Sequence, residues 1–242
     1  MTRTVLTVTG SDRKDFLQGL VTNDVNGLED GLVYAALLTP QGKYLADFFL
    51  LRLGDAIGID VASELAPGLL QRLNMYKLRA DVQIAASDLA VTRGTGPVPE
   101  GGFADPRHPA LGWRSYAGAA GDGADFDAIR VTHCIPETGI ELGPDSYILE
   151  CGFERLHGVD FRKGCYVGQE VTARMKHKTE LRKGLATVTV DGSAAPGTAI
   201  TRDGRPVGML HSRSGDRAIA YLRFDRADGE MQAGDATVTW VK

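Results

Sequence analysis

The chain has 242 residues, of which 43% are hydrophobic, and its 27 basic and 31 acidic side chains give a formal net charge of -4. This length and composition can bury one large core or two unequal ones. The negative charge excludes a protein-wide positive field that would hold nucleic acid or an anionic membrane surface, so a site for either has to be a local patch.

The N-terminal stretch MTRTVLTVTGSDRKDF lacks both the apolar core of a signal peptide and a small-residue cleavage site. No apolar run in the chain reaches the roughly 18 residues that a membrane span requires. The sequence therefore predicts a cytoplasmic protein with no membrane partner. No nucleic-acid partner is expected from its charge.

The chain contains three cysteines, Cys134, Cys151 and Cys165. An odd, sparse set argues against a disulfide framework, and the wide spacing lacks the paired C-x-x-C units of zinc and iron–sulfur sites. We therefore predict no resident metal. Cys134 and Cys151 are expected to be small buried hydrophobic residues.

The first half of the chain mixes strand and helix patterns. TVLTVTG alternates apolar and polar residues like a strand, and SDRKDFLQGLVTND then has a helical apolar face, with Ser11 or Asp12 as N-cap. Residues 32–61 predict a β-meander with turns at PQGK and LGD. Residues 63–84 predict a helix that tolerates Pro67 in its first turn, followed by a strand.

The second half changes character. Residues 94–123 are rich in Gly, Pro and Ala and predict surface loops, and DFDAIRVTHCIPETG predicts a helix that runs into a loop. The segments LATVTVDG, TAITRDGRPVGMLHSRSGDRAIAYLRF and ATVTWVK read as short strands with turns at DG and SGD. We therefore expect an α+β region over residues 1–184 and a small all-β domain over residues 185–242.

The segment KGCYVGQE places a thiol in an unusual setting. It comprises Lys163, Gly164, Cys165, Tyr166, Val167, Gly168, Gln169 and Glu170. The thiolate is the reactive form of cysteine, and nearby cations such as Arg162 and Lys163 favour that form. Glycines allow backbone conformations closed to other residues, or a close approach to a ligand. The pattern is typical of a functional cysteine held on a turn.

The alternative interpretation is a turn that carries a buried cysteine, followed by a solvated basic face in RMKHKTELRK. His177 in that run sits among cations, which make it a poor metal ligand, and we assign it to the surface. The density of unusual residues within eight positions favours the functional interpretation.

At this point the residues carry a resemblance. KGCYVGQE resembles the signature of the YgfZ/Iba57 family, folate-binding proteins related to the glycine-cleavage T-protein. The segments FLQGLVTNDV, LTPQGKYLADFFLL, NMYKLRADVQI, IPETGIELGPDSYILECGFERLHGVDFRKGCYVGQEVTARMKHKTELRKGLA and GDRAIAYLR also resemble family segments, in the family's order. Together they touch most of the chain.

The resemblance implies an α+β, T-protein-like fold, with mixed subdomains around a central cavity and a C-terminal β-barrel. It implies a role in the assembly, maturation or repair of iron–sulfur enzymes, mainly those with [4Fe–4S] clusters, that depends on the thiol of Cys165. The partners would be folate and iron–sulfur enzymes or cluster carrier proteins. Three roles for the thiol stay open, as a nucleophile, a redox group or an iron ligand, and nothing in the sequence establishes substrate turnover.

The implied cofactor is tetrahydrofolate or a one-carbon derivative. Its pterin presents N–H donors that a carboxylate accepts in pairs, and Glu150 in YILECGF matches the T-protein glutamate that holds the pterin. The alternative for Glu150 is a position on the solvent face of an amphipathic helix. Asp47 in YLADFF matches one of two adjacent T-protein acids, and Ala46 replaces the other. The alternative for Asp47 is an acid facing water at a strand edge.

Four further residues are candidates for the folate cavity. Asn23 and Tyr76 would line it, although Tyr76 lies at helical spacing from Leu69 and Leu73, which favours core packing. Arg174 and Arg223 would meet the anionic glutamate tail.

Two other functions remain open from the sequence. One is a T-protein-like aminomethyltransferase, which the loss of an acid at Ala46 and the cysteine signature argue against. The other is a folate-binding protein related to tRNA modification, supported only by the basic run from Arg174 to Lys183. No phosphate-binding G-x-x-x-x-G-K-[ST] loop accompanies that run.

Overall fold

The structure is a computed structural model that describes residues 2–178 and 180–241. The chain divides into two compact units. The first comprises Met1–Ala124 and Phe153–Ala173, and the second Asp125–Gly152 and Arg174–Lys242. Each unit is described by itself, and the domain boundary expected between residues 184 and 185 stays a prediction.

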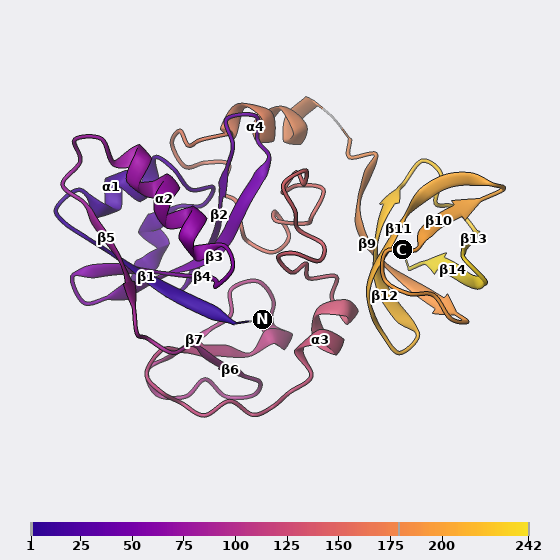
Figure 1. Cartoon of the computed structure of the whole chain (residues 1–242), viewed down its shortest axis with the longest axis horizontal. Coiled ribbons are helices and arrows are strands. Elements are labelled where there is room, and N and C mark those ends of the chain that lie inside the picture. The colour runs from indigo at the N-terminus through magenta and orange to yellow at the C-terminus, as the bar shows by residue number, and fades with distance from the viewer. Residues whose placement is uncertain (1, 179, 242) are drawn as a thin grey trace. The chain divides into compact units, whose positions relative to one another are not determined.

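The first unit is built on a five-stranded antiparallel sheet in the order β2-β3-β4-β1-β5 (Figure 1). Its strands are β1 (Arg3–Thr9), β2 (Val33–Leu38), β3 (Tyr44–Leu53), β4 (Ala56–Ala62) and β5 (Gln83–Ser87). The β-meander expected over residues 32–61 is confirmed. Every residue of β2 is buried, and an all-buried strand indicates a sheet covered on both faces.

The helices α1 (Arg13–Gln18) and α2 (Ala66–Lys77) contribute to the main hydrophobic core on one face of this sheet. Pro67 lies in the first turn of α2, as predicted. The helix predicted to continue to residue 24 is wrong beyond Gln18, because Val21 bridges to Leu37 and the chain turns toward the sheet. The 3-10 helix η1 (Val25–Glu29) follows.

The expected N-cap of α1 is only partly right. Asp12 occupies the N-cap position, but its side chain makes no cap hydrogen bond. Its carboxylate instead accepts a hydrogen bond from the backbone N–H of Asp81 at 2.8 Å. The side chain of Asp12 therefore joins the start of α1 to the segment before β5.

The segment from 94 to 123 is more ordered than the loops predicted there. It contributes to an antiparallel sheet of β6 (Thr92–Gly94), β8 (Trp113–Ser115) and β7 (Gly102–Ala104), and contains the 3-10 helix η2 (Pro109–Leu111). The buried Arg114 holds it in place by donating to Asp60 and Asp105, each at 3.1 Å. Burial alone would raise the pKa of Asp105, but Arg107 and Arg114 hold it well below its ordinary value.

The second unit carries α3 (Phe126–Thr132) and a closed six-stranded barrel. The barrel strands, in chain order, are β9 (Lys183–Asp191), β10 (Ala199–Arg202), β11 (Arg205–Ser214), β12 (Arg217–Arg223), β13 (Glu230–Ala233) and β14 (Ala236–Trp240). The all-β tail is thus confirmed. Buried and more exposed residues alternate along β9, the period-2 pattern of a strand with one face on a core.

A buried arginine fastens α3 to the barrel. Arg130 donates to the buried carboxylate of Glu141 at 3.0 Å and to the hydroxyl of Ser212 on β11. Pairing with Glu141 offsets the cost of burying the guanidinium. Within the described part of the chain, no helix is long and apolar enough to cross a membrane.

Candidate functional site

The segment Lys163–Glu170 lies on the first unit and leads into α4 (Gln169–Lys178). Lys163 and Tyr166 are buried, whereas Gly164 and Cys165 are exposed. The backbone N–H of Gln169 donates to the carbonyl oxygen of Tyr166 at 3.3 Å as the helix begins. The exposed thiol of Cys165 thus lies between two buried residues, Lys163 and Tyr166, that anchor the segment.

The first anchor is the ammonium group of Lys163. It donates to the backbone carbonyl oxygens of Gln18 at 2.7 Å, Val21 at 2.5 Å and Asn23 at 3.1 Å. Three acceptors match the three donors of a lysine. Burial lowers the pKa of Lys163 from 10.5 to about 8. The lysine therefore fastens the segment to residues 18–23. Of the two cations that precede Cys165 in the sequence, Lys163 is buried and Arg162 is exposed.

The second anchor is Tyr166. Its ring is buried and lies 5.2 Å from the ammonium group of Lys163, within the range of a cation–π contact. Burial raises the pKa of its hydroxyl to about 12. Tyr166 remains a neutral phenol at physiological pH, and its position indicates a packing role.

The third anchor is Gly168, which has a positive φ of 84°. A Cβ atom added there would lie 2.6 Å from the carbonyl oxygen of Thr39 and 3.0 Å from the Cβ of Leu38. Only glycine fits at this approach to the end of β2. Val171, one turn further on, meets the β2–β3 turn at Gly42, so the start of α4 is seated on that hairpin.

Gly164 differs from Gly168. It has no positive φ, and a Cβ added to it would meet nothing within 4 Å. The fold therefore does not require glycine at this position. Its effect is to leave open space beside the exposed thiol of Cys165.

The other two cysteines are buried, as predicted. Burial raises the pKa of the Cys151 thiol to about 12, which keeps it as an unreactive thiol. Cys134 is 9% exposed. Of the three thiols, Cys165 is the one that a reagent or partner reaches from solvent.

Asp47 does not face water at a strand edge, so that alternative is wrong. It is 5% exposed and accepts hydrogen bonds from the hydroxyls of Tyr34 at 2.9 Å and Tyr44 at 2.6 Å. Burial and the neighbouring Asp47 carboxylate raise the pKa of Tyr34 well above its ordinary value. Asp47 is thus a hydrogen-bonded carboxylate inside the first unit.

Asn23 links this acid to the cysteine segment. Its side-chain amide donates to the backbone carbonyl oxygens of Tyr34 at 2.8 Å and His157 at 2.7 Å. The backbone carbonyl oxygen of Asn23 accepts a hydrogen bond from the ammonium group of Lys163. Hydrogen bonds thus link Lys163 to Asn23, Asn23 to Tyr34 and Tyr34 to Asp47, with backbone and side-chain groups of Asn23 and Tyr34 making separate bonds. Three residues that the sequence selected separately are brought together in one network.

Asn23 also lines a hollow of about 490 Å³ in the first unit, with Asp24, His157 and Asp160 among its other lining residues. Tyr76 is half-buried and packs against the main core, as its helical spacing predicted. Ala46 is 2% exposed and belongs to the same core. A carboxylate at position 46 would be buried among apolar side chains, which is costly.

Glu150 lies in the second unit, in a turn rather than on a helix. It is 8% exposed, so the expected alternative of a solvent-facing helix is wrong. Its carboxylate accepts from the hydroxyl of Tyr221 at 2.6 Å and lies 3.7 Å from the ammonium group of Lys183. Burial and the bond to Glu150 raise the pKa of Tyr221 above its ordinary value.

The two candidate arginines differ in their surroundings. Arg223, at the end of β12, is 48% exposed and forms a 3.7 Å ion pair with Asp225. In the β9–β12 register it lies opposite Lys183, the residue that pairs with Glu150. Arg174 is exposed on α4.

Sequence reasoning missed the residues that form hydrogen bonds or an ion pair with the carboxylates of Asp47 and Glu150. Tyr34 and Tyr44 cover Asp47, and Tyr221 with Lys183 covers Glu150. A tyrosine inside an otherwise aliphatic, fully buried strand such as β2 was an available signal, because a buried hydroxyl needs a hydrogen-bond partner.

The comparisons with known proteins first define the class. The crystal structure of the glycine cleavage system aminomethyltransferase T from Bartonella henselae matches with a TM-score of 0.79 and 15% identity, covering 99% of this chain and 82% of that one. The family model described as CAF17, C-terminal beta-barrel domain, matches residues 182–242. The protein is therefore a T-protein-like α+β protein with a C-terminal barrel.

Sequence relatives then narrow the assignment. The mitochondrial iron–sulfur cluster assembly factor IBA57 of Mus musculus is 30% identical, over 95% of this chain and 78% of the relative. The IBA57 homolog of Mycosarcoma maydis is 32% identical, over 84% of this chain and 59% of that longer protein. The chain belongs to the YgfZ/Iba57 family.

Proposed function

We propose that this protein is an accessory factor for the assembly, maturation or repair of iron–sulfur enzymes, mainly those with [4Fe–4S] clusters, and that it depends on the thiol of Cys165. The observation that carries the proposal is the exposed Cys165 on a segment fixed by Lys163, Tyr166 and Gly168. The names of its relatives as iron–sulfur cluster assembly factors support it.

The geometry of the segment favours a thiol that meets a partner. Attack on a partner atom, a transient mixed disulfide and brief iron ligation all need an accessible thiolate. Exposed Cys165, with open space at the neighbouring Gly164, offers a thiol that a partner can reach. The partners would be iron–sulfur enzymes or cluster carrier proteins, with the cluster as cargo.

We further propose that the protein binds tetrahydrofolate or a one-carbon derivative. An ionised carboxylate has about four acceptor positions, and the hydroxyl of Tyr221 is a close donor to one Glu150 oxygen while Lys183 stands further away. Glu150 thus has acceptor capacity for the N–H groups of a pterin. Asp47 and Asn23 are engaged inside the first unit, so their expected contact with folate requires them to exchange partners.

The test is complementation of a strain that lacks the gene. A [4Fe–4S] enzyme and glycine cleavage are assayed side by side in the same extracts. We expect the wild-type chain to restore the [4Fe–4S] enzyme and to leave glycine cleavage unchanged. If glycine cleavage is what falls and recovers, the protein is an aminomethyltransferase instead.

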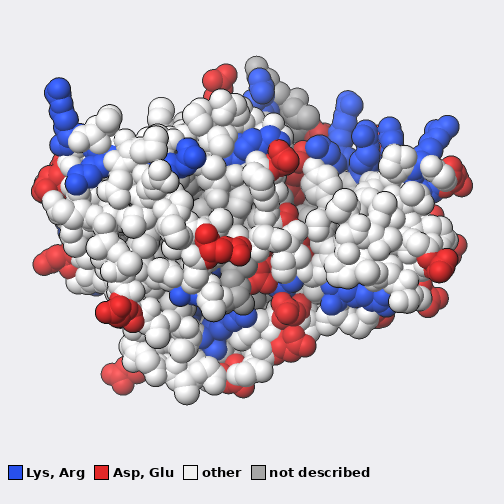
Figure 2. Space-filling model, viewed as in Figure 1, with Lys and Arg blue, Asp and Glu red and all other residues white. Residues whose placement is uncertain are grey.

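That second function has one observation in its favour, the T-protein-like fold. Its proposed carboxylate, Asp47, is 5% exposed under two tyrosine hydroxyls, and position 46 lies in the core. A nucleic-acid role has less support, because the formal net charge is -4. Figure 2 shows several basic side chains along the upper right edge of one face, and acidic side chains scattered over the rest of that face. The cytoplasmic location stays a prediction, since the names of the relatives place those proteins in mitochondria.

A further inference from the structure

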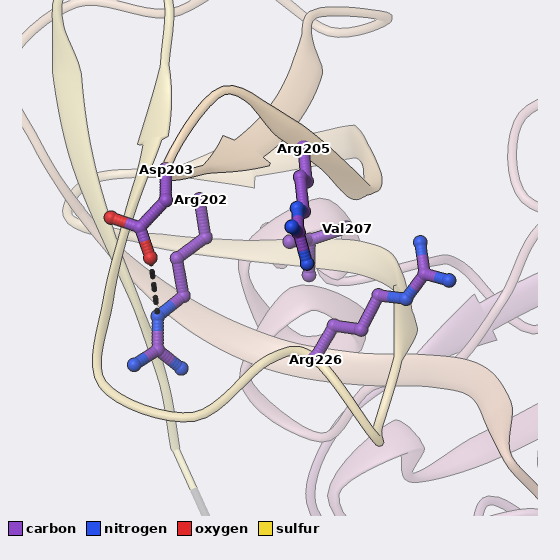
Figure 3. A pocket seen from close by; sticks show the side chains of 5 residues that line it. All are labelled: Arg202, Asp203, Arg205, Val207 and Arg226. Atoms are coloured by element: carbon purple, nitrogen blue, oxygen red, sulfur yellow. Dashed lines mark ion pairs between the residues drawn. The ribbon is translucent and has the colours of Figure 1, made fainter.

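Three arginines line one hollow of about 430 Å³ in the C-terminal barrel, together with Asp203 and Val207. Figure 3 shows Arg202, Arg205 and Arg226 around this hollow, with Asp203 turned toward Arg202. We propose that this arginine pocket binds a small ligand with at least two phosphate or carboxylate groups. The proposal is independent of the function proposed for Cys165, which lies in the other unit.

The first argument is that the fold places like charges together. Arg202 and Arg205 flank the turn between β10 and β11 and are direct partners in the strand register. The two turn residues between them, Asp203 and Gly204, have φ values of 50° and 72°, as a type I′ hairpin turn requires. Such a turn holds its flanking residues opposite each other on one face. Like charges in that position destabilise a hairpin.

The second argument is that the available acids neutralise the arginines only partly. Arg202 lies 3.9 Å from Asp203, which is 89% exposed. Arg226 lies 3.8 Å from Asp225. Exposed pairs at such distances contribute little. Among the described residues, Arg205 has no ion-pair partner, so the lining of the pocket retains a net positive charge.

The third argument is that the third cation comes from a different loop. Arg226 follows β12, and its guanidinium donates to the carbonyl oxygen of Pro206 on β11 at 3.5 Å. The next residue on β11 is the buried Val207. Cations from two segments therefore share one concave site. Guanidinium groups bind phosphate and carboxylate oxygens in pairs.

The size of the hollow limits the ligand. A volume of 430 Å³ falls in the range of about 300–1,000 Å³ typical of small-molecule sites. The lining is mostly charged, with one aliphatic side chain, so it suits a compact polar anion better than an apolar molecule. A ligand with two or more acidic groups would balance the excess positive charge.

The test is calorimetric titration of the whole protein with pyrophosphate and with citrate at 0.15 M salt, one phosphate and one carboxylate probe. The variants are Arg205→Gln and Arg226→Gln. The control is Arg217→Gln, which removes an exposed charge at the other end of the β11–β12 pair. We expect single-site binding of at least one probe by the wild type and the control, and about tenfold weaker binding by each pocket variant.

Thermal unfolding supplies a second readout that separates binding from misfolding. Arg205→Gln removes the like-charge pair, so its melting temperature without anion should equal or exceed that of the wild type, while the probe that binds should stabilise it less. Which probe binds more tightly distinguishes phosphate from carboxylate ligands. Equal affinity of the wild type and both pocket variants, or binding of neither probe, would overturn the proposal.

Discussion

The ammonium group of Lys163 donates a hydrogen bond to the backbone carbonyl oxygen of Asn23 at 3.1 Å, across 140 residues of sequence. With the carbonyls of Gln18 and Val21 as further acceptors, this lysine joins the cysteine segment to the end of α1. The cation that the sequence placed beside the thiol therefore acts on the scaffold.

Lys163→Met should destabilise the protein by roughly 2–3 kcal/mol, because it leaves three carbonyl oxygens without their donor. Arg162→Met removes an adjacent but exposed cation and should change stability by less than about 0.5 kcal/mol. Urea unfolding of both variants measures the difference. Equal stability of the two variants would show that the lysine does not fasten the segment.

The same lysine predicts a pH dependence. Its pKa is about 8 in the folded protein and 10.5 ordinarily, so the unfolded chain binds more protons between these values. Stability contributed by this group therefore rises with pH from about 8 to 10.5. The stability deficit of Lys163→Met relative to wild type should widen over that window in urea unfolding. A deficit that narrows would mean that the ammonium form is the one that the fold favours.

Alkylation should distinguish the three cysteines. Iodoacetamide should add one group to the folded protein and three in denaturant, since Cys134 and Cys151 are buried and burial raises the pKa of Cys151 to about 12. Intact-protein mass spectrometry counts the adducts. A folded Cys165→Ser variant should take none, and a single adduct on that variant would contradict the placement.

The two glycines of the segment form a matched pair. Gly168→Ala should cost about 2–4 kcal/mol, because its φ of 84° and the carbonyl of Thr39 leave no room for a Cβ. Gly164→Ala should leave the unfolding free energy within about 0.5 kcal/mol of wild type while slowing alkylation of Cys165 by bulky reagents. The reverse order of stabilities would refute the assignment of Gly168 as the anchor.

Glu150→Gln should weaken folate binding about tenfold or more, because the neutral amide accepts weaker hydrogen bonds. Tyr221→Phe should change it less, since it frees an acceptor position on the carboxylate. Glu230→Gln removes an exposed acid elsewhere on the barrel and is the control. Titration of a reduced folate followed by fluorescence measures all three. Unchanged affinity for Glu150→Gln would remove this residue from the site.

Much of the fold was predictable because its strands have clear periodicity and turn residues. The barrel strand β9 alternates buried and more exposed residues. The meander over residues 32–61 instead consists of apolar runs, with β2 buried throughout, separated by turn residues. The small sheet of β6, β8 and β7 was not predictable from local pattern. It depends on Arg114 reaching Asp60, 54 positions away, and such a pairing leaves no periodic trace.

The candidate site also has features that the sequence predicted and features that it did not. The cysteine motif identified the exposed thiol because the motif is short and specific. The direction of the Lys163 side chain was not predictable, because its acceptors are backbone carbonyls, which carry no residue identity. Likewise, Asp47 and Glu150 were selected as ligand residues without their tyrosine partners. Tyr34 and Tyr44 lie on the same β2–β3 hairpin as Asp47, whereas Tyr221 is 71 positions away from Glu150.

The central claim is that the exposed thiol is the functional group. The most direct measurement compares Cys165→Ala with Cys151→Ala in the complementation assay, after both variants have been shown to fold. The account predicts that Cys151→Ala restores activity of the [4Fe–4S] enzyme and Cys165→Ala does not. Full restoration by Cys165→Ala would contradict it.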